Sequence, residues 1–82
     1  MNAKYIILKK NFAAIMFDPS IEHIEAAAQF GGADAVFSAG FFSLIFEGAD
    51  VKVLCYGGST SLGGIMSNAK IDSERIKRVL DS

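Results

Sequence analysis

Nearly continuous runs of apolar residues mark the first two predicted strands of this chain. Residues 4–9 and 12–17 both have this pattern, which is typical of strands covered on both faces. Asn11, between the two runs, can adopt the left-handed backbone conformation that a tight turn needs. The pattern therefore predicts a β-hairpin at the start of the chain.

The next segment has the signals of a helix of about three turns. Asp18 can accept hydrogen bonds from the first free N–H groups, and Pro19 at the next position lacks only a donor that would have no partner. Gly31 and Gly32 can end the helix with a left-handed cap. Three residues at helical spacing form its predicted buried stripe: Ile21, Ile24 and Ala28.

The middle of the chain predicts a second pair of strands. Residues 33–46 are apolar apart from breaks around Gly40 and at Ser43, so residues 35–37 and 41–46 form either one bent strand or two short ones. After a turn, residues 51–56 pair back as a hairpin.

A closing helix follows an irregular connection at residues 63–70. Asp72 is its predicted N-cap, with Ile71 packing on Ile76 as a hydrophobic staple. Val79 and Leu80 join Ile76 in the predicted buried stripe.

The resulting order, β-β-α-β-β-α, predicts one α+β domain over residues 1–82: a small mixed β-sheet with two helices. Eighty-two residues have surface for a single core. The chain is 51% hydrophobic, which predicts apolar surface left over for a homo-oligomer. A compact monomer with both faces of the sheet covered is the alternative.

Charge and cysteine content exclude several classes of protein. A net charge of −1 with scattered basic residues argues against nucleic acid as a partner. Apolar runs fall short of the roughly 20 residues of a membrane span, and no signal-peptide pattern opens the chain, so we expect no membrane partner. The single cysteine, Cys55, suits a reducing, cytoplasmic location and is expected to be a small buried hydrophobe.

A loop of glycines and hydroxyls follows the strand at residues 51–56. Glycine lets a ligand approach the backbone N–H groups, which predicts a site for a phosphate-like anion. The loop could equally be a wide turn, and it has neither a P-loop nor a dinucleotide-binding spacing. The predicted ligand-binding residues here are Gly57, Gly58, Ser59, Thr60 and Ser61.

His23 is the only histidine and therefore the main candidate for acid–base chemistry. Near the start of the first predicted helix it could act as a neutral base or accept a phosphoryl group, or it could lie inertly on the helix surface. One histidine and one buried cysteine leave too few ligands for a zinc-type site. We expect no metal and no cofactor.

Residues 52–63, followed by residues 71–77, resemble the Janus/ocnus family of small, cofactor-free phosphohistidine phosphatases. The shared pattern is a strand ending in Tyr-Gly-x-Ser, a glycine a few residues later and a closing helix, and residues 4–8 resemble the family's first strand. The resemblance implies a mixed sheet between two helices. It also implies a phosphate bound by Ser59 and a backbone donor at Ser61, a counter-charge from Lys4, and His23 as the catalytic histidine.

Two departures from the family bear on catalysis. The family's phosphate-holding Arg has no counterpart in residues 39–44, and a bidentate Arg is not replaced by Ser. The segment between His23 and these residues is also shorter. We therefore predict a small, non-catalytic phosphate-binding module that captures a phosphorylated small molecule, nucleotide or phosphoprotein segment. The alternatives are a phosphohistidine-type phosphatase using His23, and a protein-interaction domain with a Phe-rich surface around Phe41 and Phe42.

Overall fold

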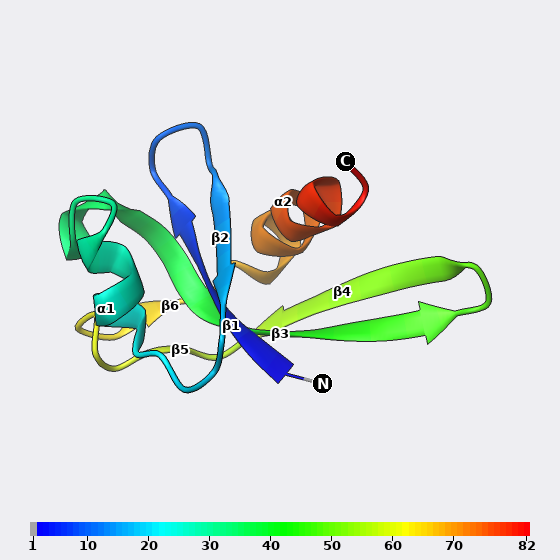
Figure 1. The fold of residues 1–82 in the computed structure, drawn as a ribbon, viewed down its shortest axis with the longest axis horizontal. Coiled ribbons are helices and arrows are strands. Elements are labelled where there is room, and N and C mark those ends of the chain that lie inside the picture. The colour runs from blue at the N-terminus through cyan, green and yellow to red at the C-terminus, as the bar shows by residue number, and fades with distance from the viewer. Residues whose placement is uncertain (1) are drawn as a thin grey trace.

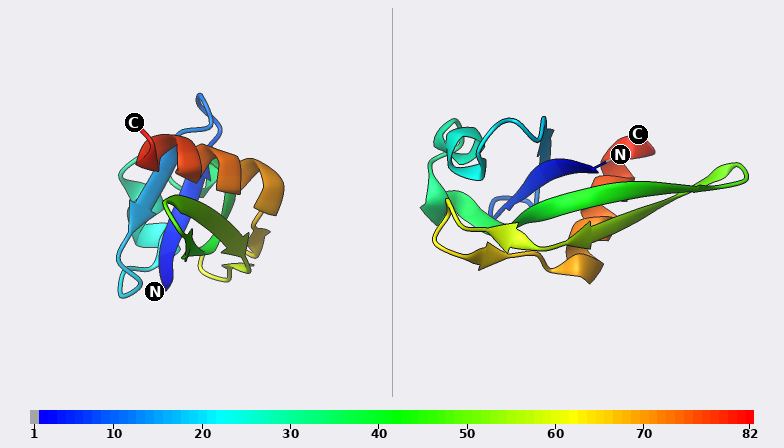
Figure 2. Two further views of the ribbon diagram at one scale, coloured as in Figure 1. Left: turned by 90° about the vertical axis from the view of Figure 1, so that its right-hand side faces the viewer. Right: turned by 90° about the horizontal axis from the view of Figure 1, so that it is seen from below.

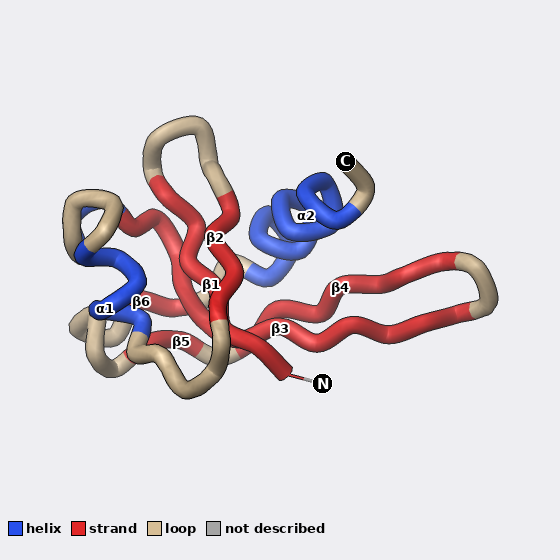
Figure 3. Tube along the Cα trace, viewed as in Figure 1, coloured by secondary structure: helices blue, strands red, loops and turns tan. Residues whose placement is uncertain are grey.

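The computed structural model describes residues 2–82, and Figures 1 and 3 show the path of the chain. The predicted order of strands and helices is confirmed, with a short 3-10 helix and a two-stranded ribbon added. The elements are β1 (Asn2–Leu8), β2 (Ala14–Phe17), α1 (His23–Ala28), η1 (Ala33–Ala35), β3 (Val36–Glu47), β4 (Asp50–Tyr56), β5 (Gly58–Ser59), β6 (Ile65–Met66) and α2 (Ala69–Leu80).

The main sheet has four strands in the order β2-β1-β3-β4, and β5 pairs with β6 in a separate ribbon. The α+β class is therefore confirmed. Every pairing within residues 2–82 is antiparallel, where a mixed sheet was expected. Of the two possibilities for residues 35–46, the single long strand is the one found, since β3 runs without interruption past Gly40.

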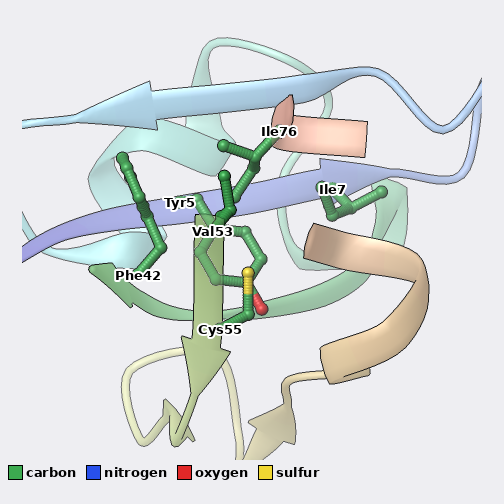
Figure 4. Packing of buried hydrophobic residues seen from close by; sticks show 6 residues of the cluster. All are labelled: Tyr5, Ile7, Phe42, Val53, Cys55 and Ile76. Carbon is green, nitrogen blue, oxygen red and sulfur yellow. The ribbon is translucent and has the colours of Figure 1, made fainter. Parts of the chain in front are cut away.

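The sheet carries one helix on each face, as Figure 2 shows from two further directions. Neighbouring residues of β1 point to opposite sides, so Tyr5 and Ile7 face α2 while Ile6 faces α1. Ile76 is the residue of α2 that is completely buried against the first side, where Figure 4 shows it over Tyr5 and Val53. Each core is thin, as expected for a chain of this size.

The first helix differs from its prediction in both start and orientation. Asp18 forms a local turn, because its carboxylate accepts from the Ser20 amide at 2.8 Å, and α1 begins only at His23. Glu22 and Glu25 form a capping box there. The predicted stripe is wrong: its three residues are exposed, and the buried face consists of His23, Ala26 and Ala27. Small alanines allow this short helix to approach the sheet closely.

The second helix begins earlier than predicted. Its N-cap is Asn68, so Asp72 lies inside the first turn and is not the cap. The Asp72 carboxylate reaches back to the Asn68 amide at 2.8 Å and also accepts hydrogen bonds from the hydroxyls of Tyr5 and Ser38. Val79 and Leu80 are exposed, which leaves Ile76 as the buried apolar residue of the predicted stripe.

The turn of the first hairpin matches the sequence. Asn11 has a φ of 60°, as expected for the β1–β2 turn, and Phe12 beside it has a φ of 51°. The Arg75 guanidinium of α2 donates to the carbonyl oxygens of both residues, at 2.7 and 3.0 Å, which ties this turn to the helix.

Within residues 2–82, no helix has the length and apolar character needed to cross a membrane.

The ends of β3 and β4 extend well beyond the rest of the sheet, as Figure 1 shows at the right. We call residues 43–54 the arm; at its base Ser43 still pairs with Asn2, and Leu44 and Val53 still pack on the α2-side core. A two-residue turn at Gly48 and Ala49 joins its strands, and Gly48 has the positive φ, 62°, that the first position of a type II′ turn requires.

Candidate functional site

The structure brings three of the predicted site residues to the chain segment that leads into α1. The Lys4 ammonium donates to the carbonyl oxygen of Ile21 at 3.0 Å. The Ser61 hydroxyl accepts from the amide of Ile24 at 3.2 Å. Because His23 lies between these two contact points in the chain, β1, the loop after β4 and the start of α1 meet in one place.

His23 is part of the core at this meeting point, not a surface residue. Its side chain is 3% exposed, and its Nε2 atom lies 2.8 Å from the carbonyl oxygen of Gly40. A carbonyl only accepts, so Nε2 carries the proton of this hydrogen bond. The rings of Phe17 and Phe41 meet the imidazole edge-on, with centroids at 5.5 and 5.6 Å. These contacts give His23 a structural role in joining α1 to β3.

The hydroxyl loop folds back on itself. Ser59 is 4% exposed, and its Oγ accepts from the Leu62 amide and lies near the Ser61 Oγ, each at 3.2 Å. The amides of Gly63 and Gly64 donate to the carbonyl oxygens of Thr60 and Ser59, at 3.1 and 2.9 Å. The hydroxyl of Ser59, predicted to face a ligand, is therefore engaged within the protein, and so are the amides of residues 62–64 that follow the predicted site.

Packing explains the two glycines that were predicted to admit a ligand. A Cβ at Gly58 would lie 2.7 Å from the sulfur of Met66 and 2.8 Å from the carbonyl oxygen of Ile65, since β5 pairs closely with β6. Gly57 has a φ of 76°, and a Cβ there would meet the ring of Phe41 at 3.1 Å. Both positions need glycine because protein atoms approach them.

Two backbone N–H groups of the loop remain open to a ligand, as the sequence predicted. In the part of the chain that the structure describes, the amides of Thr60 and Ser61 donate to no protein group. Thr60 is exposed, so these N–H groups lie at the solvent-facing tip of the loop. They are the part of the predicted anion site that the fold leaves open.

A second candidate site is the arm, which exposes large apolar side chains on both faces. Paired residues of an antiparallel hairpin share a face, so Phe46 lies with Val51 on the α2 side, and Ile45 and Leu54 lie on the α1 side. Phe46 is 71% exposed, Leu54 49% and Ile45 40%. Large apolar side chains are thus held away from the body of the protein.

The exposed apolar surface lies on the arm and not around Phe41 and Phe42, where a Phe-rich surface was expected. Phe42 is buried against Tyr5, and Phe41 is half-buried between His23 and Tyr56. The exposed aromatic side chain of β3 nearest the arm tip is Phe46. The sequence signal for it was the unbroken apolar run through residue 46, which continues beyond the body of the sheet.

An open groove of about 980 Å³ separates the outer part of β4 from α2. Its floor includes Val51 and Val53, and charged side chains from both elements form its walls. Lys77 of α2 lies 3.7 Å from the carboxylate of Asp50 at the arm tip. The side chains of α2 therefore leave the outer part of β4 open along one face.

Two ionisable groups in the α2-side core are held neutral. Burial raises the pKa of the Tyr5 phenol far above its ordinary value, and the hydrogen bond to Asp72 adds to the shift. Burial also raises the pKa of the Cys55 thiol. Cys55 is a buried residue, as predicted, and a raised pKa makes it a poor nucleophile.

Comparison with models of protein families, with curated proteins and with solved structures finds no match to this chain. The resemblance to the Janus/ocnus family therefore stays a prediction. The same holds for the catalytic role of His23, whose Nε2 atom is engaged by Gly40 in this structure.

Proposed function

We propose that this protein is an interaction domain that works as a homo-oligomer, with the arm as its contact surface. The observation that carries the proposal is the 71% exposure of Phe46 on a hairpin that extends away from the sheet. Burying a side chain of this size is worth roughly 1.5–3 kcal/mol, so an exposed cluster of such residues favours association.

The arrangement on both faces strengthens the proposal. A hairpin on the surface of a monomer usually has one polar face, because one side contacts water. Here the α1-side face is mixed: Ile45 and Leu54 are exposed on it beside the polar residues Ser43, Glu47, Asp50 and Lys52, and Phe46 and Val51 lie on the opposite face. The chain is also 51% hydrophobic, and a fold this small cannot bury all of its apolar residues, so some apolar surface is left for a partner.

The test is the molar mass in solution of the full chain and of two variants, measured by size-exclusion chromatography with light scattering. Phe46→Ser should raise the dissociation constant of the oligomer by about tenfold or more. Phe30→Ser is the matched control, because Phe30 is also exposed but follows α1, far along the chain from the arm. Equal oligomerisation of the two variants would exclude the arm as the contact surface.

A second candidate function is the capture of a phosphorylated small molecule, nucleotide or phosphoprotein segment. The observation in its favour is that the amides of Thr60 and Ser61 donate to no group among residues 2–82 and lie beside the Thr60 hydroxyl at the exposed loop tip. Successive backbone N–H groups form the concave sites that bind anions. The interaction function ranks above it because the Ser59 hydroxyl and the amides that follow this pair, those of residues 62–64, are already engaged within the protein.

Titration with inorganic phosphate and with ATP, followed by amide chemical shifts, tests this second function. Thr60→Glu places a negative charge at the exposed tip without removing any of the loop's hydrogen bonds, so it should weaken anion binding. Thr60→Gln is the matched neutral control. The second function fails if the amides of Thr60 and Ser61 do not respond to either anion in the unmodified chain.

A further inference from the structure

The outer edge of β4 has backbone groups that no strand among residues 2–82 pairs with. β4 is the last strand of the order β2-β1-β3-β4. Asp50 faces Glu47 across a two-residue turn, a position at which both backbone hydrogen bonds are exchanged. Hydrogen-bonded and non-hydrogen-bonded pairs alternate along an antiparallel strand. The backbone groups of Lys52 and Leu54 therefore also bond to β3, while those of Val51 and Val53 point outward.

Two contacts agree with this alternation and show how far the free edge extends. The Val51 amide donates to the side chain of Asp50 at 2.9 Å, and so does not bond to β3. The carbonyl oxygen of Gly57 accepts from the Ser67 amide at 2.9 Å, so the edge is covered beyond the end of β4. The uncovered edge therefore runs from residue 50 to about residue 55. It contains no proline and two charged side chains, Asp50 at its outer end and Lys52, so it has few of the features that prevent strand pairing.

We propose that two copies of the chain pair through this edge, with β4 antiparallel to β4 of the second copy about a twofold axis at Val53. This inference rests on the proposed self-association and specifies its geometry. The two four-stranded sheets would then form one continuous sheet of about eight strands.

The sequence of β4 is self-complementary in this register. Val53 lies opposite Val53 of the second copy, and Val51 lies opposite Cys55, so one face of the seam is apolar throughout. On the other face Lys52 lies opposite Leu54. The acidic arm tips, with Glu47 and Asp50, are at opposite ends of the seam and do not repel each other.

The neighbouring registers are worse for identifiable reasons. An axis at Lys52 places two lysine side chains directly opposite each other in the closest type of cross-strand pair, which is destabilising. An axis at Leu54 brings Val51 of the second copy to Gly57, whose carbonyl oxygen is already bonded to Ser67. The Val53 register is the one that matches the length of the uncovered edge.

A second copy is favoured over an unrelated strand or helix because the same short edge supplies both partners. The outward N–H and C=O groups recur at every second residue, so when the strand is reversed about Val53 the donors of one copy meet the acceptors of the other. A helix could cover one apolar face of the arm, but it has no free backbone groups to pair with Val51 and Val53.

Disulfide trapping tests the register. Lys52→Cys and Leu54→Cys are each made in a Cys55→Ser background, and the chains are oxidised with glutathione disulfide alone and as an equal mixture. In the proposed register these two positions face each other as a non-hydrogen-bonded pair, with Cα atoms about 4.5 Å apart, which a disulfide can span. A covalent dimer is expected from the mixture, at several times the yield from either variant alone.

Each other outcome overturns the inference in a distinct way. A covalent dimer from Leu54→Cys alone, or from Lys52→Cys alone, would show a different axis. Association that depends on Phe46 without trapping in the mixture would leave the proposed function intact and contradict pairing through the β4 edge. A monomeric unmodified chain would contradict both.

Hydrogen exchange of the unmodified chain provides a test that needs no variant. The Val53 amide points outward and should exchange at least about tenfold more slowly in concentrated than in dilute protein. The amides of Lys52 and Leu54 bond to β3 in either state and should change far less. Exchange of the Val53 amide that is independent of protein concentration, in a sample shown to associate, would overturn the inference.

Discussion

The Nε2 atom of His23 donates a hydrogen bond to the carbonyl oxygen of Gly40, 2.8 Å away, across the interface between α1 and β3. Gly40 itself has no room for a side chain, because a Cβ there would lie 2.5 Å from the carbonyl oxygen of Tyr56. A histidine on a short helix is thereby joined to the crowded centre of the sheet. Its contribution to stability can be separated from any chemistry by mutation.

His23→Ala should lower the free energy of unfolding by about 3 kcal/mol. It leaves the Gly40 carbonyl without its partner and opens a cavity between Phe17 and Phe41. Urea denaturation measures the loss, and Ile24→Ala is the control, since the exposed Ile24 should change stability by about 0.5 kcal/mol or less. Equal effects of the two substitutions would contradict a structural role for His23.

The phosphatase alternative has its own test at the same residue. His23→Gln retains a side-chain donor for Gly40 and should remain folded. Under the interaction function, neither the unmodified chain nor this variant releases phosphate from a phosphohistidine peptide. Release by the unmodified chain that disappears in a folded His23→Gln variant would restore the enzymatic alternative.

Asp72→Asn should destabilise the protein by about 3 kcal/mol. The carboxylate accepts from Tyr5, from Ser38 and from the Asn68 amide, and an amide group would place donors against donors at one of these contacts. Thermal and urea unfolding measure the effect, with Asp81→Asn at the exposed end of α2 as the control. A change of less than about 1 kcal/mol would show that this buried network contributes little.

Stability should fall as the pH rises above about 9. The folded protein holds Cys55 and Tyr5 neutral, because their pKa values are raised from ordinary values of 9.0 and 10.0. The unfolded chain loses these protons first, so it binds fewer protons than the folded state and is favoured by alkali. Urea denaturation between pH 8 and 11 should show the decline, and a combined Tyr5→Phe, Cys55→Ala variant should show less of it. A flat profile in the unmodified chain would be inconsistent with the raised pKa values.

Gly58→Ala separates a packing glycine from a ligand-binding one. We expect a loss of stability of about 2 kcal/mol or more, because the added Cβ overlaps Met66 and Ile65. Gly63→Ala has open space around its Cβ and should cost about 1 kcal/mol from its positive φ of 74° alone. If the order were reversed, the close pairing of β5 with β6 would be in doubt.

The strands could be predicted from sequence because their apolar runs are long and the first turn carries a specific residue, Asn11. The buried face of α1 could not be predicted in this way. Ile21 and Ile24 have the spacing of a buried stripe, yet Asp18 bonds to Ser20 and delays the helix until the Glu22–Glu25 capping box. The buried side chains then include a polar one, His23, whose burial depends on a distant carbonyl in β3 that no local pattern reveals.

The candidate site could also be predicted only in part from the sequence. The family resemblance implied that the loop after Tyr56 and the start of the first helix contribute to one site, and the structure places them in contact, where the Ser61 hydroxyl accepts from the Ile24 amide. The sequence could not show that Ser59 would be buried, because that follows from the pairing of β5 with β6. The arm was hidden for a similar reason: Phe42 and Phe46 belong to one apolar run, and only the fold, which packs Phe42 against Tyr5 and leaves Phe46 exposed, decides which of them is covered.

The central claim, that the arm mediates self-association, is tested most directly by sedimentation equilibrium of the unmodified chain over a range of concentrations. We predict an average mass that rises with concentration toward twice the 8.8 kDa of one chain, and a Phe46→Ser variant that stays near 8.8 kDa over the same range. A mass that remains at 8.8 kDa for the unmodified chain at millimolar concentration would contradict the account.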